Sequence, residues 1–229
     1  MTAPIAFLIA FLAGIAPTGI WLGFWLLEDR CDPEPKRYIF YSFALGMLAV
    51  ALALPLEQYA ESFATGFGLY LSWAAIEELL KFGAAYLAAL RLPVFDEPLS
   101  GLIYLVTAAL GFSFVENTLF LMPSIMDGNL LRAVATGDLR FIGATLVHTL
   151  ASGVIGIALG LTYYAPASVR RLAALGGLIL AILLHAYFNF FILKAGSSGT
   201  FFVFFCIWIG IIALLMFTER IKLPERDYC

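Results

Sequence analysis

The amino-acid sequence predicts an all-α membrane protein, a polytopic bundle of about seven transmembrane helices. Three observations support this class. Of 229 residues, 62% are hydrophobic and only 13% are charged, with a mean hydropathy of +0.96. Soluble globular proteins carry about a quarter charged residues, so a soluble fold of this chain would lack polar side chains to cover its surface. The apolar residues form runs of roughly 20, which is the length of a membrane-crossing helix, and these runs do not alternate as barrel strands do.

Charged, proline- and glycine-marked breaks separate the apolar runs into seven predicted spans. The two longest connections, at about residues 28–37 and 123–138, are both rich in polar residues. Within the second of them, residues 129–134 form a partly amphipathic piece, which we expect to be an ordinary loop rather than a helix on the membrane surface. In chain order, the spans are expected at about 4–27, 38–56, 63–90, 99–122, 139–164, 172–193 and 199–217.

The distribution of Lys and Arg predicts the orientation of the bundle in the cell membrane. With the N-terminus outside and the C-terminus cytoplasmic, nine basic residues fall in inner segments and three in outer segments, as the positive-inside rule requires. This orientation places Cys31 and Cys229 in the reducing cytosol, where no disulfide is expected. The net charge of −3 offers no basic cluster for a nucleic-acid partner, and the bilayer is the expected environment.

Six ionisable residues lie well inside predicted spans rather than in loops or at the ends of spans. Each charged group near the bilayer centre costs about 2.5 to 3.5 kcal/mol, so a purely structural helix rarely carries several of them. The third span carries three of the six, the fourth one, and both histidines of the chain fall in the fifth and sixth. The residues are Glu77, Glu78, Lys81, Glu116, His148 and His185.

Helical spacing groups these residues on common faces. Lys81 follows Glu78 by three residues and Glu77 by four, so it can pair with either carboxylate. One ion pair leaves the second carboxylate in need of a proton or another partner, which is the setting of a general base. His185 and Asn189 are also four residues apart and are expected to donate hydrogen bonds to a developing oxyanion. We expect these groups to share one polar cavity that opens toward the outer side.

Four short motifs in order resemble the PrsW family of bacterial intramembrane proteases and, more distantly, the CAAX prenyl endopeptidase and bacteriocin-processing (Abi) superfamily. The stretch EELLKF at 77–82 resembles the EExxK box, and FSFVEN at 112–117 resembles the FxxxEN box. His148 resembles the next conserved histidine, and HAYFN at 185–189 resembles the closing HxxxN motif. The resemblance covers about residues 28–192 of what is predicted to be one protease domain spanning residues 1–229.

The resemblance implies a glutamic-type membrane peptidase that uses neither metal nor cofactor. In this interpretation Glu77, with Glu78 beside it, takes a proton from water, and the resemblance implies that the substrate is a membrane-anchored protein such as an anti-sigma factor, cut near the outer face as the first step of regulated proteolysis. The other roles it implies are water positioning by Glu116 and His148, oxyanion binding by His185 and Asn189, and support by Lys81, Phe112 and Asn117.

Three other interpretations fit the same residues. A zinc protease would take two nitrogens and two oxygens from His148, His185, Glu116 and Glu77, although no HExxH motif is present. A proton-coupled transporter or channel would use the buried Glu and His residues as a relay, although the sequence shows no related halves. A noncatalytic scaffold would use them only for stability.

Overall fold

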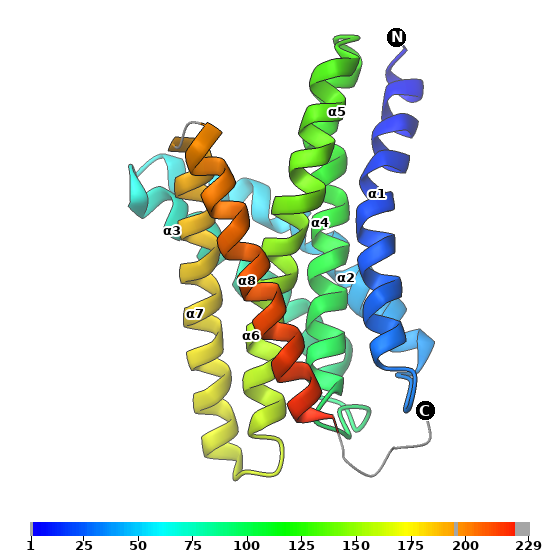
Figure 1. Cartoon of the computed structure of the whole chain (residues 1–229), viewed down its shortest axis with the longest axis vertical. Helices are drawn as coiled ribbons and strands as arrows, with labels where there is room; N and C mark the ends of the chain where they lie inside the picture. Colours follow the sequence, from blue (N-terminus) through cyan, green and yellow to red (C-terminus); the bar gives the residue numbers. More distant parts are fainter. Residues whose placement is uncertain (1, 195–196, 223–229) are drawn as a thin grey trace.

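The structure is a computed structural model that describes residues 2–194 and 197–222. Every element found in these residues is helical (Figure 1). Two of the elements are short π-helical segments, η1 and η2, which continue α3 and join α5 to α6. In chain order, the elements are α1 (Ala3–Glu28), α2 (Lys36–Glu61), α3 (Phe67–Ala85), η1 (Tyr86–Leu90), α4 (Ser100–Met126), α5 (Leu130–Leu139), η2 (Arg140–Ala144), α6 (Thr145–Leu161), α7 (Ala167–Lys194) and α8 (Ser197–Ile221).

Six helical stretches of the described chain are long and apolar enough to cross a membrane, which confirms a multi-pass bundle. The seventh predicted span corresponds to α3 with η1. This segment is not apolar enough to be counted among the six, because its three charged residues, Glu77, Glu78 and Lys81, all lie in α3. Helix α3 therefore brings a group of three charged residues into the core.

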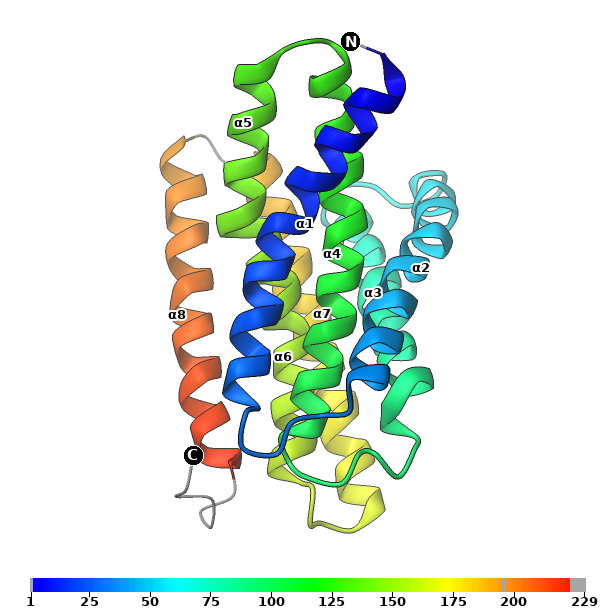
Figure 2. The ribbon, with the colours of Figure 1, turned by 90° about the vertical axis from the view of Figure 1, so that its right-hand side faces the viewer.

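Helix α4 forms the centre of the bundle and packs against α1, α2 and α6 (Figure 2). Its contact with α2 depends on two glycines. A Cβ atom on Gly46 would come within 2.0 Å of the Ala108 carbonyl oxygen, and one on Gly111 within 2.1 Å of the Phe43 carbonyl oxygen. Only glycine allows the two backbones to approach this closely, as is common where membrane helices pack.

The connection predicted as an outer loop is largely helical. Asn129 caps α5 by accepting a hydrogen bond from the Arg132 backbone N–H at 3.0 Å. Helix α5 then continues through η2 into α6, so that residues 130–161 form one continuous helical stretch. The expectation of an ordinary loop at 129–134 is therefore wrong. The apolar residues of this segment were too few to indicate a span, but they extend an existing one.

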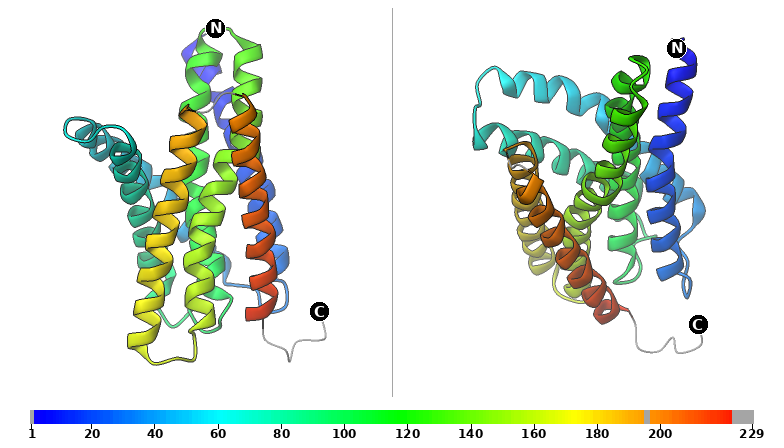
Figure 3. Two further views of the ribbon diagram at one scale, coloured as in Figure 1. Left: turned by 60° about the vertical axis from the view of Figure 1, so that its left-hand side comes forward. Right: turned by 45° about the horizontal axis from the view of Figure 1, so that its top comes forward.

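The two ends of the bundle match the two predicted membrane sides. The start of α1 and the turn between α4 and α5 lie at one end, while the α1–α2 and η1–α4 connections lie at the other (Figure 2). The turn between α2 and α3 projects to one side (Figure 3). Which end faces the cytosol stays a prediction. Cys31 is disulfide-bonded, which contradicts the expectation of a free thiol there, and Cys229 lies outside the described residues.

Candidate active site

The three charged residues of α3 are buried together. Lys81 Nζ donates a hydrogen bond to Glu78 Oε1 at 2.6 Å and lies 3.5 Å from Glu77 Oε2. Glu78 and Lys81 are 0% exposed, and Glu77 is 5% exposed. The i, i+3 and i, i+4 spacings place all three on one face of the helix, as the sequence predicts. The ammonium is therefore committed to Glu78, and Glu77 is the carboxylate nearer to open space.

His185 on α7 joins this group through its two ring nitrogens. Its Nδ1 lies 2.7 Å from Glu78 Oε1, and its Nε2 lies 3.9 Å from Glu77 Oε2. Glu78 Oε1 also accepts from Lys81, so an ionised Glu78 receives two donors and the proton belongs on Nδ1 of His185. The second nitrogen of the imidazole then faces Glu77.

His148 on α6 connects α3 to α4. Its Nδ1 lies 2.9 Å from Lys81 Nζ, and its Nε2 lies 2.8 Å from Glu116 Oε2. Because an ammonium can only donate, Nδ1 must accept, and Nε2–H must donate to Glu116. The Phe112 ring lies beside both the ammonium, 4.9 Å from its centroid, and the His148 ring. These contacts fix the tautomer and the orientation of His148.

Arg140 holds Glu116, a role that the sequence interpretation missed. Arg140 Nη2 donates to Glu116 Oε2 at 2.7 Å, and Arg140 Nε donates to Asn117 Oδ1 at 2.6 Å. Asn117 in turn donates to Thr145 Oγ1 at 3.1 Å. Arg140 was counted among the basic residues of the outer side because it lies at the outer end of the fifth predicted span. The available signal was that Glu116, within a predicted span, lacked a counter-charge on its own helix.

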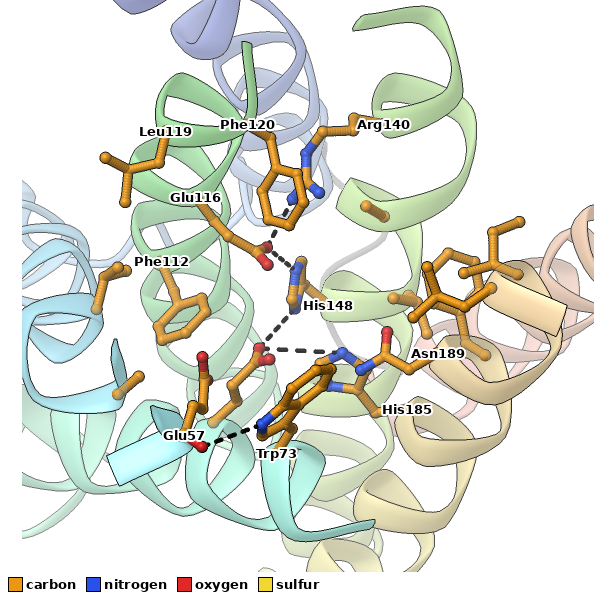
Figure 4. A pocket seen from close by; sticks show the side chains of 18 of the residues that line it. Glu57, Trp73, Phe112, Glu116, Leu119, Phe120, Arg140, His148, His185 and Asn189 are labelled. Atoms are coloured by element: carbon orange, nitrogen blue, oxygen red, sulfur yellow. Dashed lines mark hydrogen bonds and ion pairs between the residues drawn. The ribbon is translucent and has the colours of Figure 1, made fainter. Parts of the chain in front are cut away.

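A cavity of about 370 Å³ adjoins this network (Figure 4). Six of the predicted site residues line it, five of them polar and the sixth Phe112. The other three predicted residues, Glu78, Lys81 and Asn117, do not line it. Apolar side chains from six helices complete the walls. The polar predicted residues that line it are Glu77, Glu116, His148, His185 and Asn189.

Three further lining residues were not predicted as part of the site. Glu57 and Glu61 come from the last turns of α2, and Trp73 comes from α3. The indole Nε1–H of Trp73 donates to the Glu57 backbone carbonyl at 3.3 Å (Figure 4). The predicted second span ended at residue 56, so both glutamates were placed in a loop. Helix α2 in fact continues to Glu61 and carries them to the cavity.

The residue types around Glu77, one glutamate and two histidines, are also those that bind metal ions. Glu77 Oε2 is buried without a hydrogen-bond partner, and it lies 3.8 Å from His148 Nδ1 and 3.9 Å from His185 Nε2. The opposite nitrogen of each imidazole contacts a carboxylate, as is usual for metal-bound histidines. Glu116 lies outside this trio, since its Oε2 binds Arg140 and His148. The four-ligand zinc site considered above thus reduces to three ligands.

A family model described as PrsW family intramembrane metalloprotease matches residues 34–216 of the chain. The chain belongs to this family. Several curated proteins named Protease PrsW are similar to it. The Bacillus subtilis protein is 28% identical over 207 residues, covering 87% of this chain and 91% of its own length. The Oceanobacillus iheyensis protein is 30% identical over 208 residues, covering 88% and 91%. No solved structure matches the chain.

Membership of the PrsW family identifies the chain as a membrane peptidase. It also favours a hydrolase over the transporter and scaffold interpretations, which fitted the buried Glu and His residues equally well. The family is described as one of metalloproteases, whereas the names of the relatives specify only a protease. Which group activates water is therefore a question about Glu77 and its neighbours.

Proposed function

We propose that this PrsW protein cleaves a membrane-tethered protein near the outer face of the membrane, using Glu77 to activate the attacking water. The observation that carries the proposal is the difference between the two adjacent carboxylates. Glu78 Oε1 accepts hydrogen bonds from Lys81 and His185 at 2.6 and 2.7 Å and does not line the cavity. Glu77 Oε2 lies farther from the same two groups, at 3.5 and 3.9 Å, has no hydrogen-bond partner in the described chain, and belongs to a residue that lines the cavity. A general base must have an oxygen that can accept a proton from water, and Glu77 Oε2 carries no hydrogen bond that would compete with that water.

The residues around Glu77 supply the remaining requirements of peptide hydrolysis. His185 and Asn189 line the cavity one helical turn apart on α7 (Figure 4). The Asn189 amide N–H groups, and the Nε2–H of His185 once its imidazole is protonated, are the donors for the oxyanion of a tetrahedral intermediate. His148 is held in place by Glu116, and Glu116 is held by Arg140, so these residues act by positioning. Lys81 balances Glu78 and keeps the second carboxylate from acting as a competing base.

The cavity favours a peptide substrate whose side chains are mostly apolar. Its walls include Leu54, Val147, Phe188 and Phe204, and its polar groups are concentrated around Glu77 and at the end of α2. A chain segment at the edge of a transmembrane helix combines these properties. In agreement with the family resemblance, we assign the substrate to single-span membrane proteins such as anti-sigma factors, cut on their outer side.

A zinc-dependent reaction is the second candidate, and the convergence of Glu77, His148 and His185 favours it. These three residues would hold the ion, which when bound acts as a Lewis acid and lowers the pKa of a water ligand. Lys81 argues against this candidate. Its ammonium donates to His148 Nδ1 at 2.9 Å and so uses the lone pair that the metal requires.

Metal content and chelator sensitivity distinguish the two candidates. The protein would be purified in detergent, assayed on single-span peptides with and without a chelator, and analysed for bound zinc by mass spectrometry. The glutamate mechanism predicts full cleavage in the presence of chelator and less than stoichiometric zinc. Cleavage that chelation abolishes and that zinc alone restores would instead establish the metal mechanism.

A further inference from the structure

One end of the cavity carries two carboxylates that form no ion pair with a basic residue of the described chain. Glu57 and Glu61 are four residues apart near the end of α2, and both line the cavity. Glu57 is partly buried and Glu61 is exposed. Among the ion pairs found in the described residues, neither glutamate takes part. This pair differs from Glu78 and Glu116, each of which contacts a cation.

The charges in and beside the cavity are strongly one-sided. Five carboxylates are grouped there, at residues 57, 61, 77, 78 and 116, against the two permanent cations Lys81 and Arg140. Both cations already contact internal carboxylates at 2.6 and 2.7 Å. A cavity with apolar walls focuses such a charge excess and attracts groups of the opposite sign. Glu57 and Glu61 are the two carboxylates of this group that contact neither cation among the described residues.

The acidic end of the cavity is close to the proposed catalytic base. Trp73 contacts the Glu57 backbone carbonyl, and Trp73 precedes Glu77 by four residues on α3. One turn of helix rises about 5.4 Å, so Glu57 lies within a short distance of Glu77 along the cavity wall. An extended peptide spans about 3.3 to 3.6 Å per residue. A substrate side chain that reaches Glu57 therefore belongs to a residue within about three positions of the scissile bond.

From these observations we infer that Glu57 and Glu61 form a specificity site for a basic substrate residue, a Lys or Arg within about three positions of the bond that is cut. The inference rests on the proposed function, because it assigns the substrate preference of the same cavity. Complementary charge across an interface selects partners more strongly than it raises affinity. The site would therefore reject an acidic residue at this position.

The test compares matched single-span peptides that differ only in one residue near the cleavage site, carrying Lys, Gln or Glu. Each is assayed with wild-type protein, with Glu57→Gln and Glu61→Gln, and with the charge reversal Glu57→Lys. Asp127→Asn is the matched control, because Asp127 is an exposed carboxylate in the turn after α4 and does not line the cavity. The readout is the ratio of kcat/KM for the Lys peptide to that for the Glu peptide.

We expect wild-type protein and Asp127→Asn to prefer the Lys peptide by about fivefold or more at low ionic strength, with the preference falling as salt is added. Glu57→Gln should reduce the ratio, and Glu57→Lys should invert it. Equal cleavage of all three peptides by wild-type protein, or an unchanged ratio in both Gln variants, would overturn this inference while leaving the proposed function intact. Failure to cleave any peptide would overturn the proposed function and the inference together.

Discussion

Two adjacent glutamates on α3 have different surroundings, and this difference decides their roles. Glu78 accepts hydrogen bonds from an ammonium and an imidazole, while Glu77 Oε2 accepts none. Residue spacing placed both beside Lys81 and did not distinguish them. The shorter contacts of Lys81 and His185 with Glu78 separate a buried structural carboxylate from one that is available to a water molecule. The same contrast predicts different consequences of removing each carboxylate.

Replacing Glu78 should damage the fold as well as the activity. In Glu78→Gln, Lys81 and His185 lose the buried negative charge that they share, and breaking a buried ion pair costs about 3 to 5 kcal/mol. Unfolding in detergent, followed by circular dichroism, would measure this loss of stability. Glu219→Gln is a suitable control because that side chain is 66% exposed. A Glu78→Gln protein as stable as the control would contradict the assigned structural role.

Arg140 should affect turnover more than substrate binding. Arg140→Ala removes the guanidinium that holds Glu116 and Asn117, so that His148 loses a fixed partner. We expect kcat to fall by about tenfold with a smaller change in KM, since displaced positioning groups weaken the transition state. Arg140→Lys should recover part of the loss, because a lysine ammonium can replace one of the two guanidinium contacts, those with Glu116 and Asn117. Equal kinetics in Arg140→Ala and Arg132→Ala, an exposed arginine on α5, would contradict this role.

At the scale of helices, the contact between α2 and α4 brings the acidic end of the cavity to its catalytic centre. Gly46 and Gly111 allow this contact because any larger residue would meet a carbonyl oxygen of the facing helix. Helix α4 carries Phe112 and Glu116 directly after Gly111, while α2 carries Glu57 three turns beyond Gly46. A substitution that pushes α2 away from α4 therefore displaces the acidic end of the cavity relative to its catalytic centre.

Alanine at Gly46 should destabilise the bundle by about 1 to 3 kcal/mol or more, since overpacking against a backbone cannot be relieved by side-chain movement. Detergent unfolding would show the change, and cleavage should fall with it. Gly23→Ala is the control because a Cβ there meets no atom within 4 Å. Equal stability of the two variants would show that α2 and α4 do not pack as closely as described.

The helices were predictable to different degrees for physical reasons. Seven spans follow from runs of apolar residues, and each corresponds to an observed helix. Helix α5 and the end of α2 were not predicted, because their polar residues face a cavity or the membrane edge and resemble loop residues in the sequence. Arg140 and Glu57 were missed for this reason. Spacing within one helix was informative, whereas contacts between helices such as Lys81 with His148 depend on packing that the sequence alone does not reveal.

At the scale of the whole molecule, the end of the bundle opposite the α4–α5 turn gathers buried acidic residues. Tyr104 donates to Glu34, Asp29 Oδ2 accepts from the Glu34 backbone N–H at 2.8 Å, and Glu97 lies within the same group. Burial, together with the charges of Asp29 and Glu34, raises the pKa of Glu97 to about 7, and burial raises the pKa of Glu34. This cluster joins the α1–α2 and η1–α4 connections.

These raised pKa values predict that stability decreases as the pH rises. Between pH 4.5 and about 7 the folded protein binds more protons at Glu97 than the unfolded chain does, so the stabilisation present below pH 4.5 is lost through pH 7. Glu97→Gln should weaken this dependence. Thermal unfolding in detergent at several pH values would measure it. A Tm that rises from pH 5 to 8 in wild-type protein and equally in the variant would contradict the prediction.

The central claim is that Glu77 activates water in a PrsW protease. The most direct measurement is cleavage of a single-span peptide by wild-type protein, Glu77→Gln and the control Glu219→Gln, all in the presence of a chelator and with folding checked by circular dichroism. We predict that wild-type protein and the control cleave with equal rates. Glu77→Gln should lose at least about 100-fold in kcat, the contribution expected of a general base. A folded Glu77→Gln protein that retains a rate within tenfold of wild-type would contradict the claim.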